Sequence, residues 1–116
     1  MQQILHIATV RGWQAAQADG EYRVSTLGAT IDEVGFIHAS TPEQVHATAH
    51  RFYAHVAEPL VVLVLDGDVL DAAGVPVQYE DAGNGEVFPH LYAALPVALV
   101  LDVRPAGFDE TGAFSY

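Results

Sequence analysis

The segment Gly35-Phe36-Ile37-His38-Ala39-Ser40-Thr41-Pro42-Glu43-Gln44 holds the clearest element boundary in this sequence. Its first five residues are typical of a short strand. Thr41 as N-cap, Pro42 as the first helical residue and Gln44 three positions after the cap then form a capping box, which predicts the start of a helix. A strand that leads at once into a helix indicates a domain built from both kinds of element.

The helix that follows is expected to run to about Val56, and Pro59 would end it. Its core face is predicted from apolar residues at i, i+4, i+7 and i+11, which are Val45, Ala49, Phe52 and Val56.

A second strand and helix lie at the start of the chain. Gln3 to Ala8 is an apolar stretch that predicts a strand, and Thr9 can cap a helix from Val10 to about Asp19, which Gly20 would stop. Residues 21–34 show no clear period, so a loop or an irregular edge is expected there.

Leu60 to Leu65 is a continuous run of apolar β-formers and predicts a strand buried on both faces. A short helical turn is expected at Val69 to Ala73. Val75 to Tyr79 and Val87 to Tyr92 could pair as a hairpin, with Asn84-Gly85 supplying the positive φ angles of the turn.

Pro89 lies inside the second hairpin strand and predicts a sheet edge or a bulge, because proline has no N–H to donate. Val97 to Val103 is the last predicted buried strand. From Pro105 to Tyr116 the glycine and polar content rises, which predicts a loosely held tail.

These elements predict a single small α+β domain over residues 1–116, with a split antiparallel or mixed sheet and two main helices. Strands that follow one another without regular alternation with helices favour α+β over a doubly wound sheet. The length of 116 residues also fits one domain.

The composition excludes several functions. The net charge is -11, with four arginines and no lysine, so a DNA-binding role is improbable and an RNA substrate is disfavoured. The absence of cysteine excludes disulfides and thiolate metal sites. No apolar run reaches the roughly 20 residues of a membrane span and the N-terminus lacks a signal-peptide pattern, so no membrane contact and a cytoplasmic location are expected.

Candidate site residues lie in three short segments. His6 and His38 each stand in a strand two or three residues before a predicted helix N-terminus, where free backbone N–H groups attract anions. In the third segment Glu86, Phe88, His90 and Tyr92 alternate, so an extended strand would place all four on one face. We therefore expect His6, His38 and His90 to face one cleft.

Structural explanations stand beside these functional ones. A histidine in a strand is commonly a packed, hydrogen-bonded ring, and Glu86 directly after Asn84-Gly85 can be a solvated turn residue. His46 and His50 have the i, i+4 spacing of a zinc pair, but the glutamate of a zincin helix is absent, so a solvated helix face is expected. No metal site is predicted.

Four runs of sequence resemble a known family: His6-Ile7-Ala8-Thr9, Gly35 to Val45, Arg51-Phe52, and Glu86-Val87-Phe88-Pro89-His90-Leu91-Tyr92, together with Trp13. They resemble the bacterial proteins of the domain of unknown function 952 family, over about residues 4–104. The resemblance implies an ADP-ribosyltransferase-like fold, whose cleft binds a nicotinamide dinucleotide (NAD) in active relatives. It does not imply activity.

A more distant resemblance suggests roles for single residues. Transferases that remove a 2′-phosphate from RNA carry a histidine followed seven residues later by a tryptophan, as His6 and Trp13 do here, and an Ile-His pair such as Ile37-His38. By analogy His6 would hydrogen-bond a ribose hydroxyl or the nicotinamide amide, and His38 would line the same cleft.

The same analogy makes Glu86 the residue that stabilises an oxocarbenium-like transition state, and Phe88 or Tyr92 the ring that stacks on nicotinamide. One departure from those relatives is Leu5, which stands where they tend to hold an arginine.

Two functions remain open from the sequence. The first is an enzyme or inactive relative that binds or cleaves a nicotinamide dinucleotide or related nucleotide, and the second is a non-catalytic domain that binds a small ligand or a partner. The predicted catalytic residues are Glu86 and His38. The predicted cofactor-binding residues are His6, Thr9, Ser40, Phe88, His90 and Tyr92.

Overall fold

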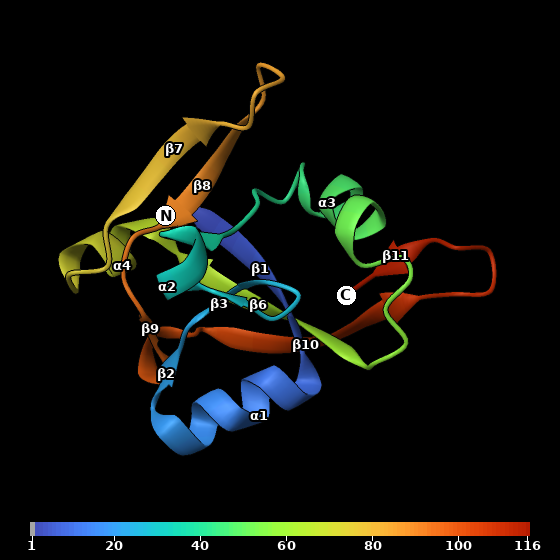
Figure 1. Cartoon of the computed structure of the whole chain (residues 1–116), viewed down its shortest axis with the longest axis horizontal. Helices are drawn as coiled ribbons and strands as arrows, with labels where there is room; N and C mark the ends of the chain where they lie inside the picture. The colour runs from blue at the N-terminus through green and yellow to red at the C-terminus, as the bar shows by residue number, and fades with distance from the viewer. Residues whose placement is uncertain (1) are drawn as a thin grey trace.

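Strand β6 (Leu60–Asp66) is the central strand of the main sheet, between β1 (Gln3–Thr9) and β10 (Asp102–Phe108). A computed structural model describes residues 2–116. The short β11 (Phe114–Ser115) pairs with β10, and all three pairings are antiparallel (Figure 1). The buried strand predicted at Leu60 to Leu65 is therefore confirmed, one residue longer.

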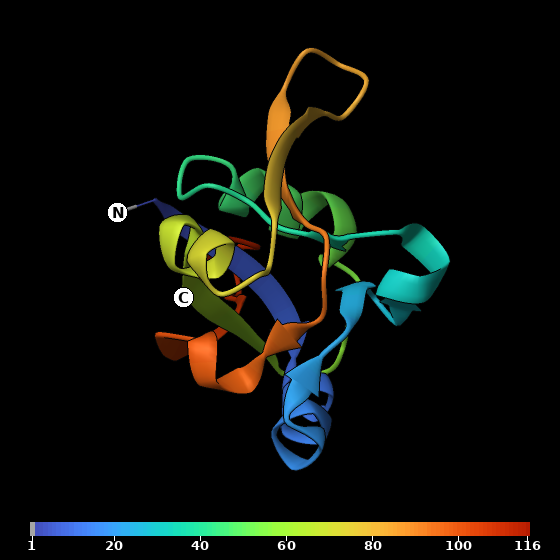
Figure 2. The ribbon, with the colours of Figure 1, turned by 90° about the vertical axis from the view of Figure 1, so that its left-hand side faces the viewer.

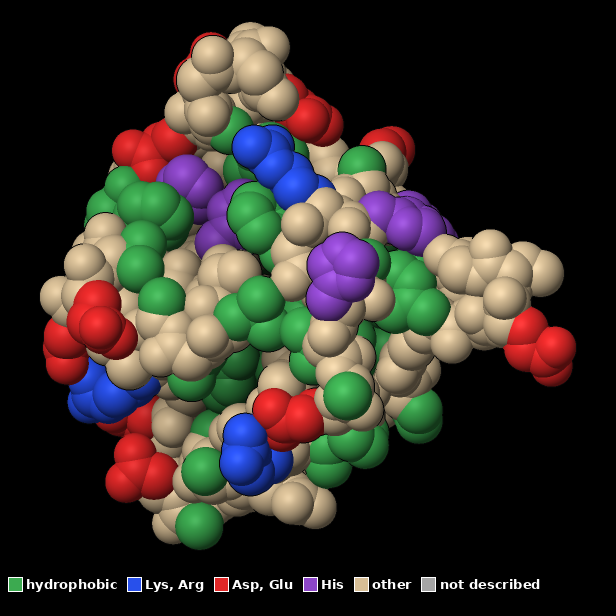
Figure 3. Space-filling view, turned by 45° about the vertical axis from the view of Figure 1, so that its right-hand side comes forward, with side chains coloured by type: hydrophobic (Ala, Val, Ile, Leu, Met, Phe, Trp, Pro, Cys, Tyr) green, Lys and Arg blue, Asp and Glu red, His purple; other side chains and the backbone are tan. Residues whose placement is uncertain are grey.

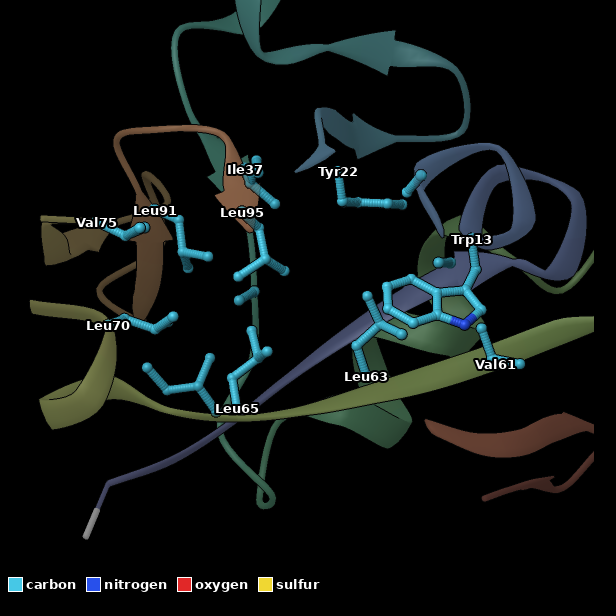
Figure 4. Close-up of a cluster of buried hydrophobic side chains, with 14 residues drawn as sticks. Trp13, Tyr22, Ile37, Val61, Leu63, Leu65, Leu70, Val75, Leu91 and Leu95 are labelled. Atoms are coloured by element: carbon cyan, nitrogen blue, oxygen red, sulfur yellow. The ribbon is translucent and has the colours of Figure 1, made fainter. Parts of the chain in front are cut away.

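Both faces of β6 are buried, which explains why its sequence is apolar without alternation. Val61, Leu63 and Leu65 face the larger core, together with Trp13 of the first helix and residues of the second sheet (Figure 4). Leu60, Val62 and Val64 face a smaller core on the opposite side. The sheet thus divides the hydrophobic interior into two layers.

A second antiparallel sheet has the order β5 (Ile37–His38), β8 (Val87–Leu91), β7 (Val77–Asp81). It joins the main sheet through a bridge in which Leu5 and Ser40 exchange two backbone hydrogen bonds of 2.8 Å. Strands β7 and β8 form the predicted hairpin, which extends away from the rest of the molecule (Figure 2).

The hairpin differs from its prediction at two points. Pro89 lies in the middle strand, not at an edge, because β5 pairs on its other side: the Pro89 carbonyl accepts from Ala39 N–H at 3.0 Å, and only the reciprocal bond is missing. In the turn, Gly83 and Gly85 take positive φ angles and Asn84 does not, so Asn84-Gly85 is not the expected pair of left-handed residues.

Helix α1 (Val10–Asp19) has the predicted bounds. The Thr9 hydroxyl accepts from Gly12 N–H at 3.0 Å, and Gly20 ends the helix with a φ of 92°, which glycine adopts without steric cost. Both the cap and the stop predicted from the sequence are confirmed.

Helix α3 (Val45–Phe52) is shorter than the helix expected from Pro42 to Val56. Residues 42–44 form a turn, and only one half of the capping box is present, in which the Gln44 side chain accepts from Thr41 N–H at 3.1 Å. The buried stripe continues from Val45 and Ala49 to Tyr53 at i+8, so Phe52, with 39% exposure, is not a core residue.

The remaining elements are short. Residues 21–34, expected to be irregular, form two-residue and three-residue strands and one helical turn. The short elements are β2 (Glu21–Tyr22), β3 (Val24–Thr26), β4 (Ala29–Thr30), α2 (Ile31–Val34), α4 (Gly67–Ala72), β9 (Leu95–Pro96) and a 3₁₀ turn at Val97–Leu99. Strand β2 pairs with β9, and β3 pairs with β4.

The C-terminal part differs most from the sequence prediction. The strand expected at Val97 to Val103 is a 3₁₀ turn followed by a strand that begins only at Asp102. Residues 105–116, expected to be a loose tail, complete β10, turn, and return as β11. Phe114 is 4% exposed and packs in the smaller core against α3, which fixes this segment.

The chain is a small α+β domain with curled antiparallel sheets and, within residues 2–116, four α-helices, of which α1 and α3 are the longer two. In that part of the chain no helix has the length and apolar character needed to span a membrane.

Candidate functional site

A pocket of about 330 Å³ lies between the β7–β8 hairpin, β5 and helix α3. Its lining contains five aromatic rings, one cation and two carboxylates. The ring and charged side chains that line it are Phe36, Phe52, Phe88, His38, His90, Arg51, Asp81 and Glu86. Figure 3 shows histidine side chains beside an arginine and hydrophobic groups on this side of the molecule.

The register of the second sheet brings the two histidines of the pocket together. His38 pairs directly with His90, and residues paired in this way project from the same face of a sheet. Their neighbours Ile37 and Leu91 project from the other face into the larger core. Phe88 precedes His90 by two residues and therefore shares its face.

The two imidazoles belong to a chain of hydrogen bonds. His38 Nδ1 lies 3.3 Å from His90 Nε2, and His90 Nδ1 lies 2.8 Å from Glu80 Oε1. The Tyr92 hydroxyl donates to the same oxygen of Glu80. Each hydrogen bond to the carboxylate lowers the pKa of Glu80, so this side chain is ionised near neutral pH.

Burial, together with the neighbouring His90 imidazole and the Arg51 guanidinium, lowers the pKa of His38 to about 4. At neutral pH the ring is therefore uncharged, and one of its nitrogens is an acceptor.

Aromatic contacts hold both imidazoles in place. The Phe36 ring stacks on His90, with ring centroids 3.9 Å apart and planes 13° apart. The Phe88 ring tilts against His38 at a centroid distance of 5.1 Å. These contacts limit rotation of both rings and give the pocket flat apolar walls suited to a planar ligand.

Arg51 differs from the other arginines of the chain. Arg11, Arg23 and Arg104 each form an ion pair with a nearby carboxylate, at 2.6 to 3.1 Å. Within residues 2–116 Arg51 forms no such pair, and its guanidinium lies 5.2 Å from the centre of the Phe52 ring. A cation of this kind in an acidic protein is available to an anionic ligand.

Four of the eight site residues predicted from the sequence line this pocket: His38, Glu86, Phe88 and His90. Tyr92 lies beside it, with its ring centroid 5.7 Å from that of Phe36. The predicted alternation along β8 thus brings Glu86, Phe88 and His90 to one cavity.

His6 lies behind the pocket and does not line it. Its Nδ1 is 2.6 Å from the His38 carbonyl oxygen and its Nε2 is 2.9 Å from the Tyr22 hydroxyl, so both nitrogens have protein partners. Burial lowers its pKa to about 4. His6 therefore supports the strand that carries His38, and the structure does not bring all three histidines into one open cleft.

Ser40 and Thr9 are also outside the pocket. The Ser40 hydroxyl donates to Thr48 Oγ1 at 3.0 Å in the interior. Thr9 caps α1 and lines a separate pocket of about 320 Å³, next to Tyr22 and Tyr53.

Sequence reasoning missed Glu80, Phe36 and Arg51 as site residues. Glu80 pairs with Phe88 across the hairpin and therefore lies on the face of His90. The first predicted hairpin strand ends at Tyr79, whereas β7 runs from Val77 to Asp81, so the sequence prediction leaves Glu80 in the connection between the strands. Phe36 stands two residues before His38, and the same alternation could have indicated it. No sequence pattern around Arg51 indicated a site, because Arg51 reaches the pocket only through the packing of α3 beside the hairpin.

No group of three or more residues within 2–116 could hold a metal ion. His46 and His50 are exposed on α3 and contact Phe114 and Phe108 of the C-terminal strands, with ring centroids 5.9 and 5.2 Å apart.

Comparison with known proteins gives a family and a fold. Residues 7–103 match the family model described as "Protein of unknown function (DUF952)". The X-ray crystal structure of protein CC0527 from Caulobacter crescentus is similar, with 31% sequence identity and a TM-score of 0.82, over 97% of this chain and 93% of that chain. The solution NMR structure of CC0527 gives 32% identity and a TM-score of 0.76, over 97% and 91% of the two chains. No curated protein matches the chain.

Proposed function

The chain belongs to the DUF952 family of proteins of unknown function, and we propose that it binds a small anionic ligand with a planar ring, a nicotinamide dinucleotide or a related nucleotide, in the pocket between α3 and the β7–β8 hairpin. The observation that carries this proposal is Arg51, a cation without a carboxylate partner within residues 2–116, at a pocket walled by phenylalanine and histidine rings.

Each part of such a ligand has a complement in the pocket. Phe36 and Phe88 offer apolar ring faces to a heterocycle, and Arg51 offers a charge-assisted hydrogen bond to a phosphate. A volume of about 330 Å³ is near the lower end of the usual range for ligand sites, roughly 300 to 1,000 Å³, so it suits one nucleoside half of a dinucleotide.

A second candidate function is cleavage of the same ligand. Glu86 lines the pocket, and a carboxylate beside a bound ribosyl group can stabilise the positive charge that develops when the glycosidic bond breaks. This candidate also draws on the resemblance to ADP-ribosyltransferase-like proteins. Without turnover, the protein remains a binding module on the same scaffold.

Thermal unfolding in the presence of nicotinamide dinucleotide, nicotinamide mononucleotide, adenosine monophosphate and adenosine tests the proposal. Binding to the native state at 100 times Kd stabilises it by about 2.7 kcal/mol, which is a measurable rise in Tm. We expect the phosphate-bearing ligands to raise Tm and adenosine to raise it less.

Arg51→Gln should weaken binding of the mononucleotide at least about tenfold, because a charge-assisted hydrogen bond contributes roughly 1.5 to 3 kcal/mol. Arg104→Gln is the matched control, since Arg104 lies outside the pocket and pairs with Asp102. The proposal is wrong if no nucleotide shifts Tm, or if both variants bind as the wild type does.

A further inference from the structure

The hydrogen-bond chain from Glu80 to His38 fixes which ring nitrogen of each histidine carries the proton. Glu80 as a carboxylate only accepts hydrogen bonds, so His90 Nδ1, at 2.8 Å from Glu80 Oε1, must be the donor. With His90 as the neutral imidazole, its other nitrogen is then bare. His90 Nε2 is therefore an acceptor.

The bare nitrogen of His90 in turn determines the tautomer of His38. His90 Nε2 lies 3.3 Å from His38 Nδ1, so His38 Nδ1 donates the proton of this bond. The second nitrogen, His38 Nε2, is left with a free lone pair. His38 Nε2 is also a buried side-chain nitrogen that has no hydrogen-bond partner among residues 2–116, so that part of the chain supplies no donor to it.

The surroundings of His38 make that lone pair costly to leave unpaired. The rings of Phe52 and Phe88 pack against the His38 ring, with centroid distances of 6.3 and 5.1 Å. A buried acceptor without a partner costs about 1 to 3 kcal/mol, and a ligand that supplies a donor recovers that cost. Such a site favours ligands with an N–H or O–H over otherwise similar ligands that lack one.

We infer that Glu80 and His90 are positioning residues that hold His38 in its Nδ1–H form, so that His38 Nε2 accepts a hydrogen bond from an N–H or O–H of the bound ligand. This inference rests on the proposed function for the identity of the ligand, which would offer a carboxamide N–H or a ribose O–H. The tautomers themselves are a property of the free protein.

Phe36 and Tyr92 complete the arrangement. The Phe36 ring stacked on His90 prevents that imidazole from turning over, and Tyr92 donates to the Glu80 oxygen that His90 uses. Glu80 is thus held by two donors, and His90 is held by a carboxylate and a ring face. These contacts favour the arrangement in which both imidazoles carry the proton on Nδ1 over the one in which both carry it on Nε2.

The test is long-range ¹H–¹⁵N NMR of the ¹⁵N-labelled protein at pH 7.5. We expect His90 and His38 each to be protonated at Nδ1 and bare at Nε2. In Glu80→Gln the side-chain amide can donate to His90 Nδ1, which reverses the chain, so the single Nδ1–H form of His38 should be lost. Glu86→Gln is the matched control, because Glu86 lines the same pocket with no side-chain hydrogen bond to either histidine in residues 2–116.

Two results would overturn the positioning role: His38 protonated at Nε2 in the wild type, or unchanged tautomers in a folded Glu80→Gln variant with a wild-type amide spectrum. The ligand step is tested separately. Nicotinamide mononucleotide at saturation should shift the ¹⁵N resonance of His38 Nε2. If the mononucleotide raises Tm without that shift, His38 Nε2 accepts no hydrogen bond from the ligand, and this step is wrong.

Nicotinic acid mononucleotide distinguishes the two donors, since it keeps the ribose hydroxyls and lacks the carboxamide N–H. Nicotinic acid also adds a carboxylate charge, so the Nε2 resonance makes the assignment: loss of the shift in the bound acid assigns the donor to the carboxamide, and the same shift assigns it to ribose. If no nucleotide of the panel binds, the proposed function fails, while the tautomers of the free protein still decide the roles of Glu80 and His90.

Discussion

His6 Nδ1 lies 2.6 Å from the carbonyl oxygen of His38, so the histidine of the first strand holds the backbone of the second candidate histidine. Because that carbonyl accepts, His6 carries its proton on Nδ1, and its Nε2 accepts from the Tyr22 hydroxyl at 2.9 Å. The two histidine motifs that look alike in sequence therefore have different roles: His6 holds the strand that carries His38, and His38 lines the pocket.

His6→Ala should lower the free energy of unfolding by about 2 to 4 kcal/mol, because it opens a cavity and leaves the Tyr22 hydroxyl and the His38 carbonyl without their partner. Tyr22→Phe removes only one of these hydrogen bonds and should cost about 1 to 2 kcal/mol. Urea unfolding measures both. A loss below 1 kcal/mol in His6→Ala would contradict the supporting role.

Stability should fall as the pH decreases from about 6.5 to about 4. Burial lowers the pKa of both His6 and His38 to about 4, whereas imidazole in an unfolded chain titrates near ~6.5. Between these values the unfolded state binds protons that the folded state does not, so the stability present above pH 6.5 is lost on acidification.

The slope from His6 approaches about 1.4 kcal/mol per pH unit in that window. Urea unfolding between pH 4.5 and 7.5 measures it, and His6→Asn should make the profile flatter. Equal slopes in the two proteins would show that His6 titrates alike in both states.

Phe114→Ala should destabilise the protein by about 3 kcal/mol, since this ring is 4% exposed in the smaller core and its loss leaves a cavity next to α3. Glu110→Ala, in the exposed turn before β11, is the control and should change the free energy of unfolding by less than about 0.5 kcal/mol. If Phe114→Ala has no effect, the C-terminal segment is as loosely held as its sequence predicts.

Leu27→Asn should stabilise the protein by about 0.5 to 1 kcal/mol. Leu27 has a φ of 45° and precedes Gly28 at 88° in the turn between β3 and β4, where a two-residue hairpin loop favours Asn-Gly. Leu101→Asn is the control, because Leu101 is also exposed and lacks a positive φ. A lower Tm in Leu27→Asn would contradict this prediction. It would mean that packing of the leucine side chain stabilises the protein by more than the positive φ of Leu27 destabilises it.

If the protein cleaves the dinucleotide, Glu86→Gln should slow nicotinamide release by roughly 10² or more, because it removes a charge that stabilises the transition state. Chromatography of nicotinamide over time measures the rate. Glu43→Gln, an exposed carboxylate outside the pocket, should release at the wild-type rate. Release that is unchanged in Glu86→Gln excludes this residue from the chemistry, and no release from the wild type favours the binding module.

Features governed by neighbouring residues could be predicted from the sequence. Thr9 and Gly20 determine the two ends of α1, and the unbroken apolar run at β6 indicates a strand covered on both faces. The alternation of Glu86, Phe88 and His90 predicts that they share one face, and all three line the pocket. Each of these depends on backbone conformation or on side-chain spacing within about ten residues.

Other features could be known only from the tertiary structure, because they depend on contacts between residues far apart in the chain. Residues 105–116 carry weak strand signals and are ordered because β6 and α3 offer them a hydrogen-bonding edge and an apolar surface. His6 and His38 stand in similar sequence contexts. Only the pairing of β1 with the segment that follows β5, through Leu5 and Ser40, places His6 in the core as a hydrogen-bonded ring and His38 at the pocket. Arg51 becomes a site residue when α3 docks beside the hairpin, since a helix cannot encode locally which strand its exposed cation will face.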